Sequence, residues 1–332
     1  MKKTVASPPF SYRPGMPGYV FRDWEIIDYE CYELPETGLW FRGPQSATLE
    51  PGRYFSALGA AQTFGCFCPH PYPALLEKRL GFPALNLGYS GAGPAFFLQH
   101  PEILAHVNRG AFCILQVMSA RSTSNSQFDN PEGLAHGRHR ATGKPAVAEN
   151  IFKEALWWDL DRIPLPYRVI MPFLKYLSIP LPTARRLVGE SRENYMRDFG
   201  ALMAAITVPK ILLWFSERQP SYAPRYHSCW WLLERFPQLV DKKMIRELSN
   251  SADRYIKCVS SRGMPQPLFS RFSGVPVSVD LRDDKKPLSG GSGETASLYE
   301  GFWKNNAYYP SPQMHEDAAV SLETVCRDYI PD

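Results

Sequence analysis

The stretch YFSALGAAQTFG, from Tyr54 to Gly65, decides the fold. Residues 54–58 form a short apolar run typical of a buried strand, and the small residues of 59–65 predict a tight turn directly after it. Similar apolar runs follow at 83–88 (PALNLG) and 112–118 (FCILQVM), with helix-like segments between them. Strands that alternate with helices predict a parallel sheet.

The same alternation returns in the C-terminal third of the chain. Residues 210–215 (KILLWF) form a continuous apolar run, which predicts a buried parallel strand, and 254–259 (RYIKCV) predict a fifth strand. A proline-bearing run at 275–279 (VPVSV) predicts an edge strand. Helices are predicted over 72–80, 94–107 and 241–250.

The chain divides into four predicted segments. Residues 1–50 are rich in aromatics, proline and glycine and are expected to wrap the core, whereas 51–126 and 208–332 supply the two halves of an α/β core. Between these halves, 127–207 interrupt the sheet with a polar loop over 129–150 and helices over 151–160, 167–177 and 183–206. We expect this insertion to cover the carboxyl edge of the sheet rather than to form an oligomer face. Residues 281–297, charged and then rich in glycine and serine, predict a mobile loop.

Composition narrows the class of protein. Of the 332 residues, 44% are hydrophobic and 21% charged, which predicts an ordinary packed core. The formal net charge of +4 is not gathered into one basic run, so nucleic acid is not an expected partner. We find no signal peptide and no apolar window near the roughly 18 to 20 residues that span a bilayer, and we therefore expect a cytoplasmic protein.

The seven cysteines are scattered through predicted core elements, which favours reduced thiols. Cys66-Phe67-Cys68 alone has the spacing of metal ligands, with His70 as the near neighbour. A single Cys-x-Cys pair without a second cluster is weak evidence for zinc. No metal site is therefore expected.

Short phrases after the predicted strands resemble those of the SGNH, or GDSL-like, hydrolase superfamily. That family carries Gly-Asp-Ser-x-Thr after its first strand, Asn-x-Gly after its second, an Asn-bearing loop after its third and Asp-x-x-His near its C-terminus. The corresponding phrases here are GAAQT at 59–63, NLG at 86–88, SARSTSNS at 119–126 and PQMH at 312–315. The resemblance implies an α/β fold with a three-layer, flavodoxin-like parallel sheet and a helical insertion. The phrases at 42–44, 119–122 and 308–312 also resemble an uncharacterised bacterial family with the same degenerate pattern, which implies no activity.

Of the three residues in the family's catalytic triad, this sequence retains one. Ala61 stands where the family has its nucleophilic serine, and Pro312 stands where it has an aspartate, whereas His315 is retained. A methyl group cannot attack a carbonyl. A substitute nucleophile such as Cys66 or Ser90 has no neighbouring base in the sequence.

Ligands of open α/β sheets bind beyond the carboxyl ends of the strands, where loops 59–66, 88–94, 119–126 and 216–222 are expected to meet. Backbone N–H groups of the first loop suit an oxyanion, and the hydroxyls and guanidinium of the third suit phosphate or sulfate. A simple tight turn and helix capping are the structural alternatives for these two loops. The residues predicted to contact substrate or anion are Gly59, Ala61, Gln62, Thr63, Asn86, Gly88, Ser119, Arg121, Ser122, Asn125 and Arg218.

Three functions follow, all with a small-molecule or saccharide partner. The first is a transferase in which His315 acts as the general base on a saccharide hydroxyl, as in polysaccharide modification. Its anionic donor would be an activated sulfate such as phosphoadenosine phosphosulfate, or a coenzyme A thioester, with no tightly bound cofactor. The second is a non-catalytic protein of SGNH-like fold that binds a glycan or another ligand, with His315 in a structural role. The third is an esterase or deacetylase with an unrecognised nucleophile.

Overall fold

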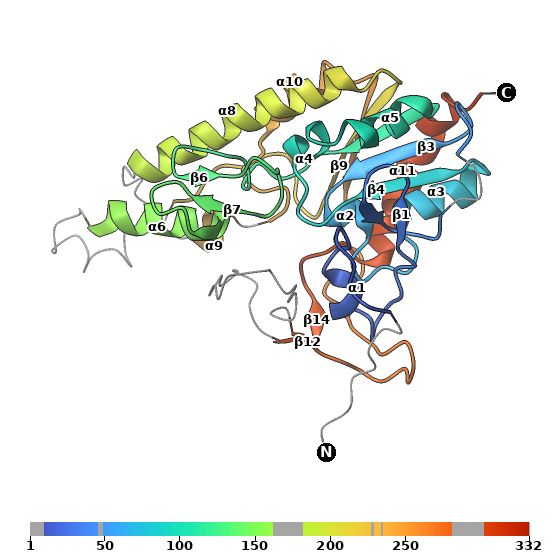
Figure 1. Ribbon diagram of the computed structural model, residues 1–332, viewed down its shortest axis with the longest axis horizontal. Helices are drawn as coiled ribbons and strands as arrows, with labels where there is room; N and C mark the ends of the chain where they lie inside the picture. The colour runs from blue at the N-terminus through green and yellow to red at the C-terminus, as the bar shows by residue number, and fades with distance from the viewer. Residues whose placement is uncertain are drawn as a thin grey trace.

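A computed structural model describes residues 10–45, 49–161, 182–226, 229–233, 235–280 and 302–331. Its centre is a five-stranded parallel sheet with the order β10-β9-β5-β3-β4 (Figure 1). The strands are β3 (Phe55–Gly59), β4 (Ala84–Gly88), β5 (Phe112–Gln116), β9 (Lys210–Ser216) and β10 (Arg254–Val259). In chain order this is 2-1-3-4-5, the flavodoxin-like order. The predicted α/β fold class and all five predicted strands are confirmed.

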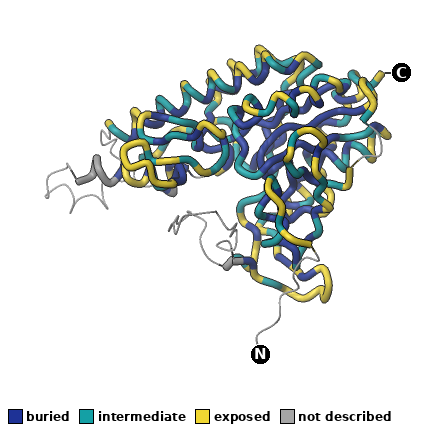
Figure 2. Tube along the Cα trace, viewed as in Figure 1, coloured by how far each residue is buried: buried dark blue, intermediate teal, exposed yellow. Residues whose placement is uncertain are grey.

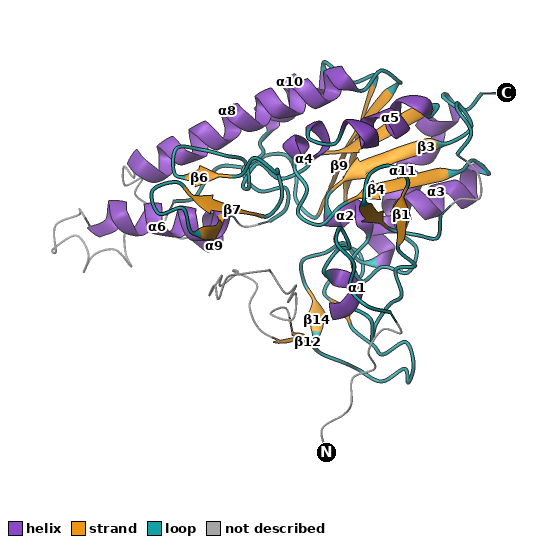
Figure 3. Ribbon diagram, viewed as in Figure 1, coloured by secondary structure: helices purple, strands orange, loops and turns teal. Residues whose placement is uncertain are grey.

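Helices cover both faces of this sheet, as Figure 3 shows. On one face lie α3 (Tyr72–Leu80) and α11 (Pro312–Arg327), and on the other lie α4 (Pro94–Leu98), α5 (Pro101–Arg109), α8 (Pro182–Ala205) and α10 (Lys242–Ser249). Successive side chains of a strand point to opposite faces. In β9, Ile211 and Leu213 accordingly pack under α11, whereas Leu212 and Trp214 pack under α8.

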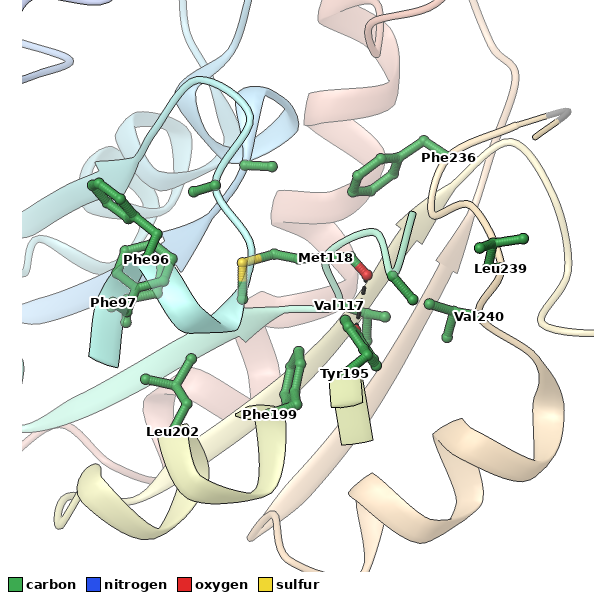
Figure 4. Packing of buried hydrophobic residues seen from close by; sticks show 14 of the residues in the cluster. Phe96, Phe97, Val117, Met118, Tyr195, Phe199, Leu202, Phe236, Leu239 and Val240 are labelled. Atoms are coloured by element: carbon green, nitrogen blue, oxygen red, sulfur yellow. Dashed lines mark hydrogen bonds between the residues drawn. The ribbon is translucent and has the colours of Figure 1, made fainter. Parts of the chain in front are cut away.

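The inner strands β3, β5 and β9 are buried on both sides, which explains why they are almost continuously apolar (Figure 2). The layer above β5 is dense with aromatic rings. In Figure 4, Tyr195 and Phe199 of α8 lie beside Val117 and Met118, which follow β5. The Tyr195 hydroxyl donates a hydrogen bond of 2.8 Å to the Met118 carbonyl oxygen, so this buried polar group is satisfied.

The insertion differs from its prediction. Residues 129–150, expected to form a loop, contain a three-stranded antiparallel sheet of β6 (Phe128–Asp129), β7 (His136–His139) and β8 (Pro145–Val147). This prediction was wrong because β7 alternates between exposed and half-buried residues and contains no apolar side chain that would mark it as a strand. Helix α6 (Ala148–Asp161) follows and contacts α8. The helix predicted over 167–177 lies outside the described residues, and whether the insertion is a cap stays a prediction.

Two further predictions were wrong, one about the length of a helix and one about the pairing of a strand. The single helix expected over 94–107 is broken between α4 and α5, because Pro101 lacks an N–H and disfavours helical geometry in the residue before it. The edge strand expected over 275–279 does not join the main sheet. Instead β12 (Val279–Asp280) pairs with β13 (Phe302–Trp303). The predicted loop over 281–297 lies outside the described residues.

The N-terminal segment is more regular than expected. It contains α1 (Tyr19–Arg22) and an antiparallel pair of β1 (Tyr32–Leu34) and β2 (Leu39–Phe41). The remaining short elements are α2 (Ala61–Phe64), α9 (Cys229–Leu232), and the pair β11 (Gln266–Pro267) and β14 (Asn305–Asn306). Among the described helices, none has the length and apolar character that crossing a membrane requires.

Candidate functional site

The turn between β3 and α2 is the centre of the candidate site. Gln116, the last residue of β5, lies under this turn, and its Oε1 accepts hydrogen bonds from the Ala60 N–H (3.0 Å) and the Thr63 hydroxyl (2.7 Å). A Cβ at Gly59 would lie 2.2 Å from that same oxygen, so only glycine permits this approach. Gln116 was not among the predicted site residues. The sequence feature that could have identified it is an amide side chain at the end of an otherwise apolar strand.

The second predicted loop braces the first. Asn86 donates from Nδ2 to the Thr63 carbonyl oxygen (3.1 Å), and its Oδ1 accepts from the Gly88 N–H (2.9 Å). A Cβ at Gly88 would lie 2.1 Å from the Phe64 nitrogen. The structure therefore brings Gly59, Thr63, Asn86 and Gly88 together, with their polar atoms bonded to protein. Contact of these residues with a ligand stays a prediction.

The third predicted loop is bonded mainly to the insertion. Arg121 forms an ion pair with Glu149 of α6, and both side chains are largely buried. Asn125 donates to the Ser191 hydroxyl of α8 at 3.1 Å and accepts from two backbone N–H groups that follow it. Ser119 donates to the Gln238 carbonyl oxygen at 3.4 Å, and Ser122 is buried. This loop thus docks the insertion, and anion binding by it is untested.

The Arg218 guanidinium is engaged within the protein. It donates to the carbonyl oxygens of Gln219 (3.0 Å), Val240 (2.8 Å) and Pro237, and it lies over the Trp214 ring, 4.9 Å from the centroid. These bonds join loop 216–222 to the segment before α10. An external anion would have to replace them.

His315 lies in the first turn of α11, which Ser311 caps by accepting from the Met314 N–H at 3.2 Å. The imidazole is fully buried against the Tyr72 and Phe215 rings, and its Nδ1 accepts from the Tyr72 backbone N–H at 3.1 Å. Burial, assisted by the nearby Arg42 guanidinium, lowers the pKa of His315 to about 3. The ring is therefore neutral, with its proton on Nε2. Among the described residues Nε2 has no hydrogen-bond partner.

A pocket of about 260 Å³ opens at the carboxyl end of β9, and Gln62, the residue after Ala61, belongs to its lining; we call it the pocket beside Ala61. Gln62 contributes a buried amide to it, and Oε1 of that amide has no partner among the described residues. Glu217 and Arg235 form an ion pair in its lining, and burial raises the pKa of the Glu217 carboxyl. Phe215, Ser216, Phe236, Ala307, Tyr308, Pro310 and Met314 complete the lining.

Cys66 and Cys68 are fully buried, and within the described ranges no group of three or more His, Cys, Asp or Glu residues is placed to hold a metal. Burial raises the pKa of the Cys68 thiol to about 12, which disfavours the thiolate that metal binding or nucleophilic attack requires.

Comparison with known proteins gives a family match over part of the chain and a distant structural likeness, and neither indicates an activity. Residues 20–130 match the model of a family described as "Domain of unknown function (DUF6473)". No curated protein matches the chain. Among solved structures, the chain is similar to a carbohydrate esterase family 2 enzyme plus carbohydrate binding domain from Corynascus thermopiles (Myceliophthora fergusii). The identity is 9% and the TM-score 0.34, over 87% of this chain and 69% of that one.

Proposed function

We propose that this protein binds a saccharide-type small molecule in the pocket beside Ala61 and does not hydrolyse it. The observation that carries the proposal is the Gln62 Oε1 atom, which is buried in the pocket lining with no partner among the described residues. A buried acceptor without a hydrogen bond costs about 1–3 kcal/mol. A ligand hydroxyl that donates to it would remove this cost.

The lining supports this class of ligand. Small-molecule sites combine apolar and aromatic walls with a few polar groups that fix orientation. Here Phe215, Phe236 and Tyr308 supply the walls, and the Gln62 amide and the Glu217–Arg235 pair supply the polar groups. The volume of about 260 Å³ lies just below the roughly 300–1,000 Å³ usual for drug-sized ligands. One sugar unit is therefore the expected occupant.

The chemistry of the site favours binding over catalysis. Ala61 offers no nucleophile, and the one lone pair of the His315 imidazole already accepts the Tyr72 N–H. A transferase with His315 as general base, using an activated sulfate or a coenzyme A thioester, would have to break that bond and expose the ring. An esterase would need a nucleophile as well. Both functions therefore receive less support than binding.

Calorimetric titration with monosaccharides and disaccharides tests the proposal. Gln62→Leu keeps the side-chain size but removes the unpaired oxygen, so we expect about tenfold weaker binding with no loss of thermal stability. Gln99→Leu, at an exposed position after α4, is the matched control and should bind as the wild type does. Equal affinity of the wild type and Gln62→Leu would show that this pocket is not the site.

Ala61→Ser separates a binding protein from a hydrolase that lacks only its nucleophile. Because the His315 lone pair is occupied, we expect the variant to hydrolyse p-nitrophenyl acetate no faster than the wild type. A clear gain of hydrolysis would mean that the remaining site still supports ester chemistry.

A further inference from the structure

A second pocket, of about 450 Å³, lies at the outer edge of the sheet between β10, α10 and the loop that follows β9. It shares no lining residue with the pocket beside Ala61. Its volume falls within the roughly 300–1,000 Å³ typical of small-molecule sites. The lining consists of Gln219, Pro220, Ser221, Lys242, Ile245, Arg246, Ser249, Tyr255 and Lys257.

The charge of this lining has one sign. Lys242, Arg246 and Lys257 are cationic, and the lining contains no carboxylate. Within the described part of the chain, none of the three forms an ion pair, although many other arginines of this protein do. Clustered cations without a counter-charge attract anions and repel one another.

One face of α10 and one side of β10 carry these groups. Lys242 and Arg246 are four residues apart on α10 and thus share a face, on which their like charges repel each other. Tyr255 and Lys257 are two residues apart on β10 and point to the same side of the sheet. The Tyr255 hydroxyl is buried without a hydrogen-bond partner among the described residues.

We propose that this pocket binds a small molecule with two or more negative charges, phosphorylated or sulfated, and a flat apolar part. The three cations would contact the anionic groups, and the Tyr255 hydroxyl would donate to one of their oxygens. The Tyr255 ring, Ile245 and Pro220 offer the apolar surface. Loop 216–222 thus contributes to an anion site through 219–221, while the Arg218 guanidinium is bonded elsewhere.

The test is calorimetric titration of the full chain with inorganic pyrophosphate, sulfate and adenosine 3′,5′-bisphosphate. We expect the bisphosphate to bind most tightly because it alone carries a flat apolar part, and all affinities to fall as salt rises. Tighter binding of sulfate than of pyrophosphate would identify the sulfated source. Arg246→Gln and Lys257→Gln should each weaken binding about tenfold, and Tyr255→Phe by a smaller factor.

Lys243→Gln is the matched control, because Lys243 is exposed on α10 but does not line the pocket. It should bind as the wild type does. An equal loss of affinity in Lys243→Gln would mean that the lysines and arginine act only through general surface charge, which would contradict the proposal. Absence of binding by all three probes would also overturn it. Since Arg246 and Lys257 are exposed, their variants should keep the wild-type melting temperature.

Discussion

The His315 imidazole makes the stability of the protein depend on pH. Its folded pKa of about 3 lies below the ordinary value of 6.5, because burial disfavours the charged ring. Below pH 6.5 the unfolded chain therefore binds a proton that the folded chain does not. The contribution of His315 to the free energy of unfolding is therefore fully present above pH 6.5. It falls, by up to about 1.4 kcal/mol per pH unit, as the pH drops toward 3.

His315→Gln isolates this contribution, since an amide oxygen can still accept the Tyr72 N–H without titrating. We expect the stability difference between wild type and variant, measured by urea unfolding, to shrink as the pH falls from 7 to 5. Carboxylates titrate in both proteins and cancel in the difference. A difference that stays constant over this range would show that the pKa of His315 is the same in the folded and unfolded states, as for a solvent-exposed ring.

At the scale of elements, the β4 strand and the α2 turn approach each other through glycine. A Cβ at Gly88 would meet backbone atoms of Thr63 and Phe64 at 2.6 Å or less. We expect Gly88→Ala to lower the free energy of unfolding by about 1–3 kcal/mol, as overpacking does. Gly189→Ala in α8 is the control, because a Cβ there meets nothing within 4 Å. It should stabilise the protein by about 0.5–1 kcal/mol. Thermal unfolding measures both, and an unchanged Gly88→Ala would contradict the close approach.

Elements were predictable where a local pattern determines them. The strands β3, β5 and β9 are buried on both faces, so an apolar run marks each of them, and Gly81 marks the end of α3. The polar hairpin of β7 and β8 carries no such pattern, since its pairing rather than its burial defines it.

The candidate site was predictable in position but not in its contacts. Loops 59–66 and 88–94 follow adjacent strands, so the sheet topology brings them together. By contrast, the partners of Arg121 and Arg218 come from α6 and from residues 219–240, which no local rule places beside them. Likewise the tautomer of His315 depends on the Tyr72 N–H, 243 residues away in the chain.

At the scale of the whole molecule, a buried polar network bonds the N-terminal segment to the loop after α2. Asp23 is fully buried, pairs with Arg22 at 2.6 Å and accepts from the Tyr29 hydroxyl at 2.6 Å. Tyr29 in turn accepts from the Phe67 N–H at 3.1 Å, in the loop after α2. The N-terminal segment is thus bonded directly to the loop that follows α2.

Arg42 also joins the N-terminal segment to the loop after α2, and its hydrogen-bond partners there are carbonyl oxygens. Its guanidinium donates to the carbonyl oxygens of Gly65 (3.3 Å), Cys68 (3.0 Å) and Pro69 (2.9 Å), and lies over the Tyr29 ring. A lysine keeps the charge but lacks the planar fork that reaches all three. We expect Arg42→Lys to lower the free energy of unfolding by about 2–4 kcal/mol, because buried carbonyls lose charged donors. Arg197→Lys, at an exposed surface pair, should change it by less than about 0.5 kcal/mol. Urea unfolding compares the two, and similar small effects would mean that the charge alone, not the fork, joins the N-terminal segment to the core.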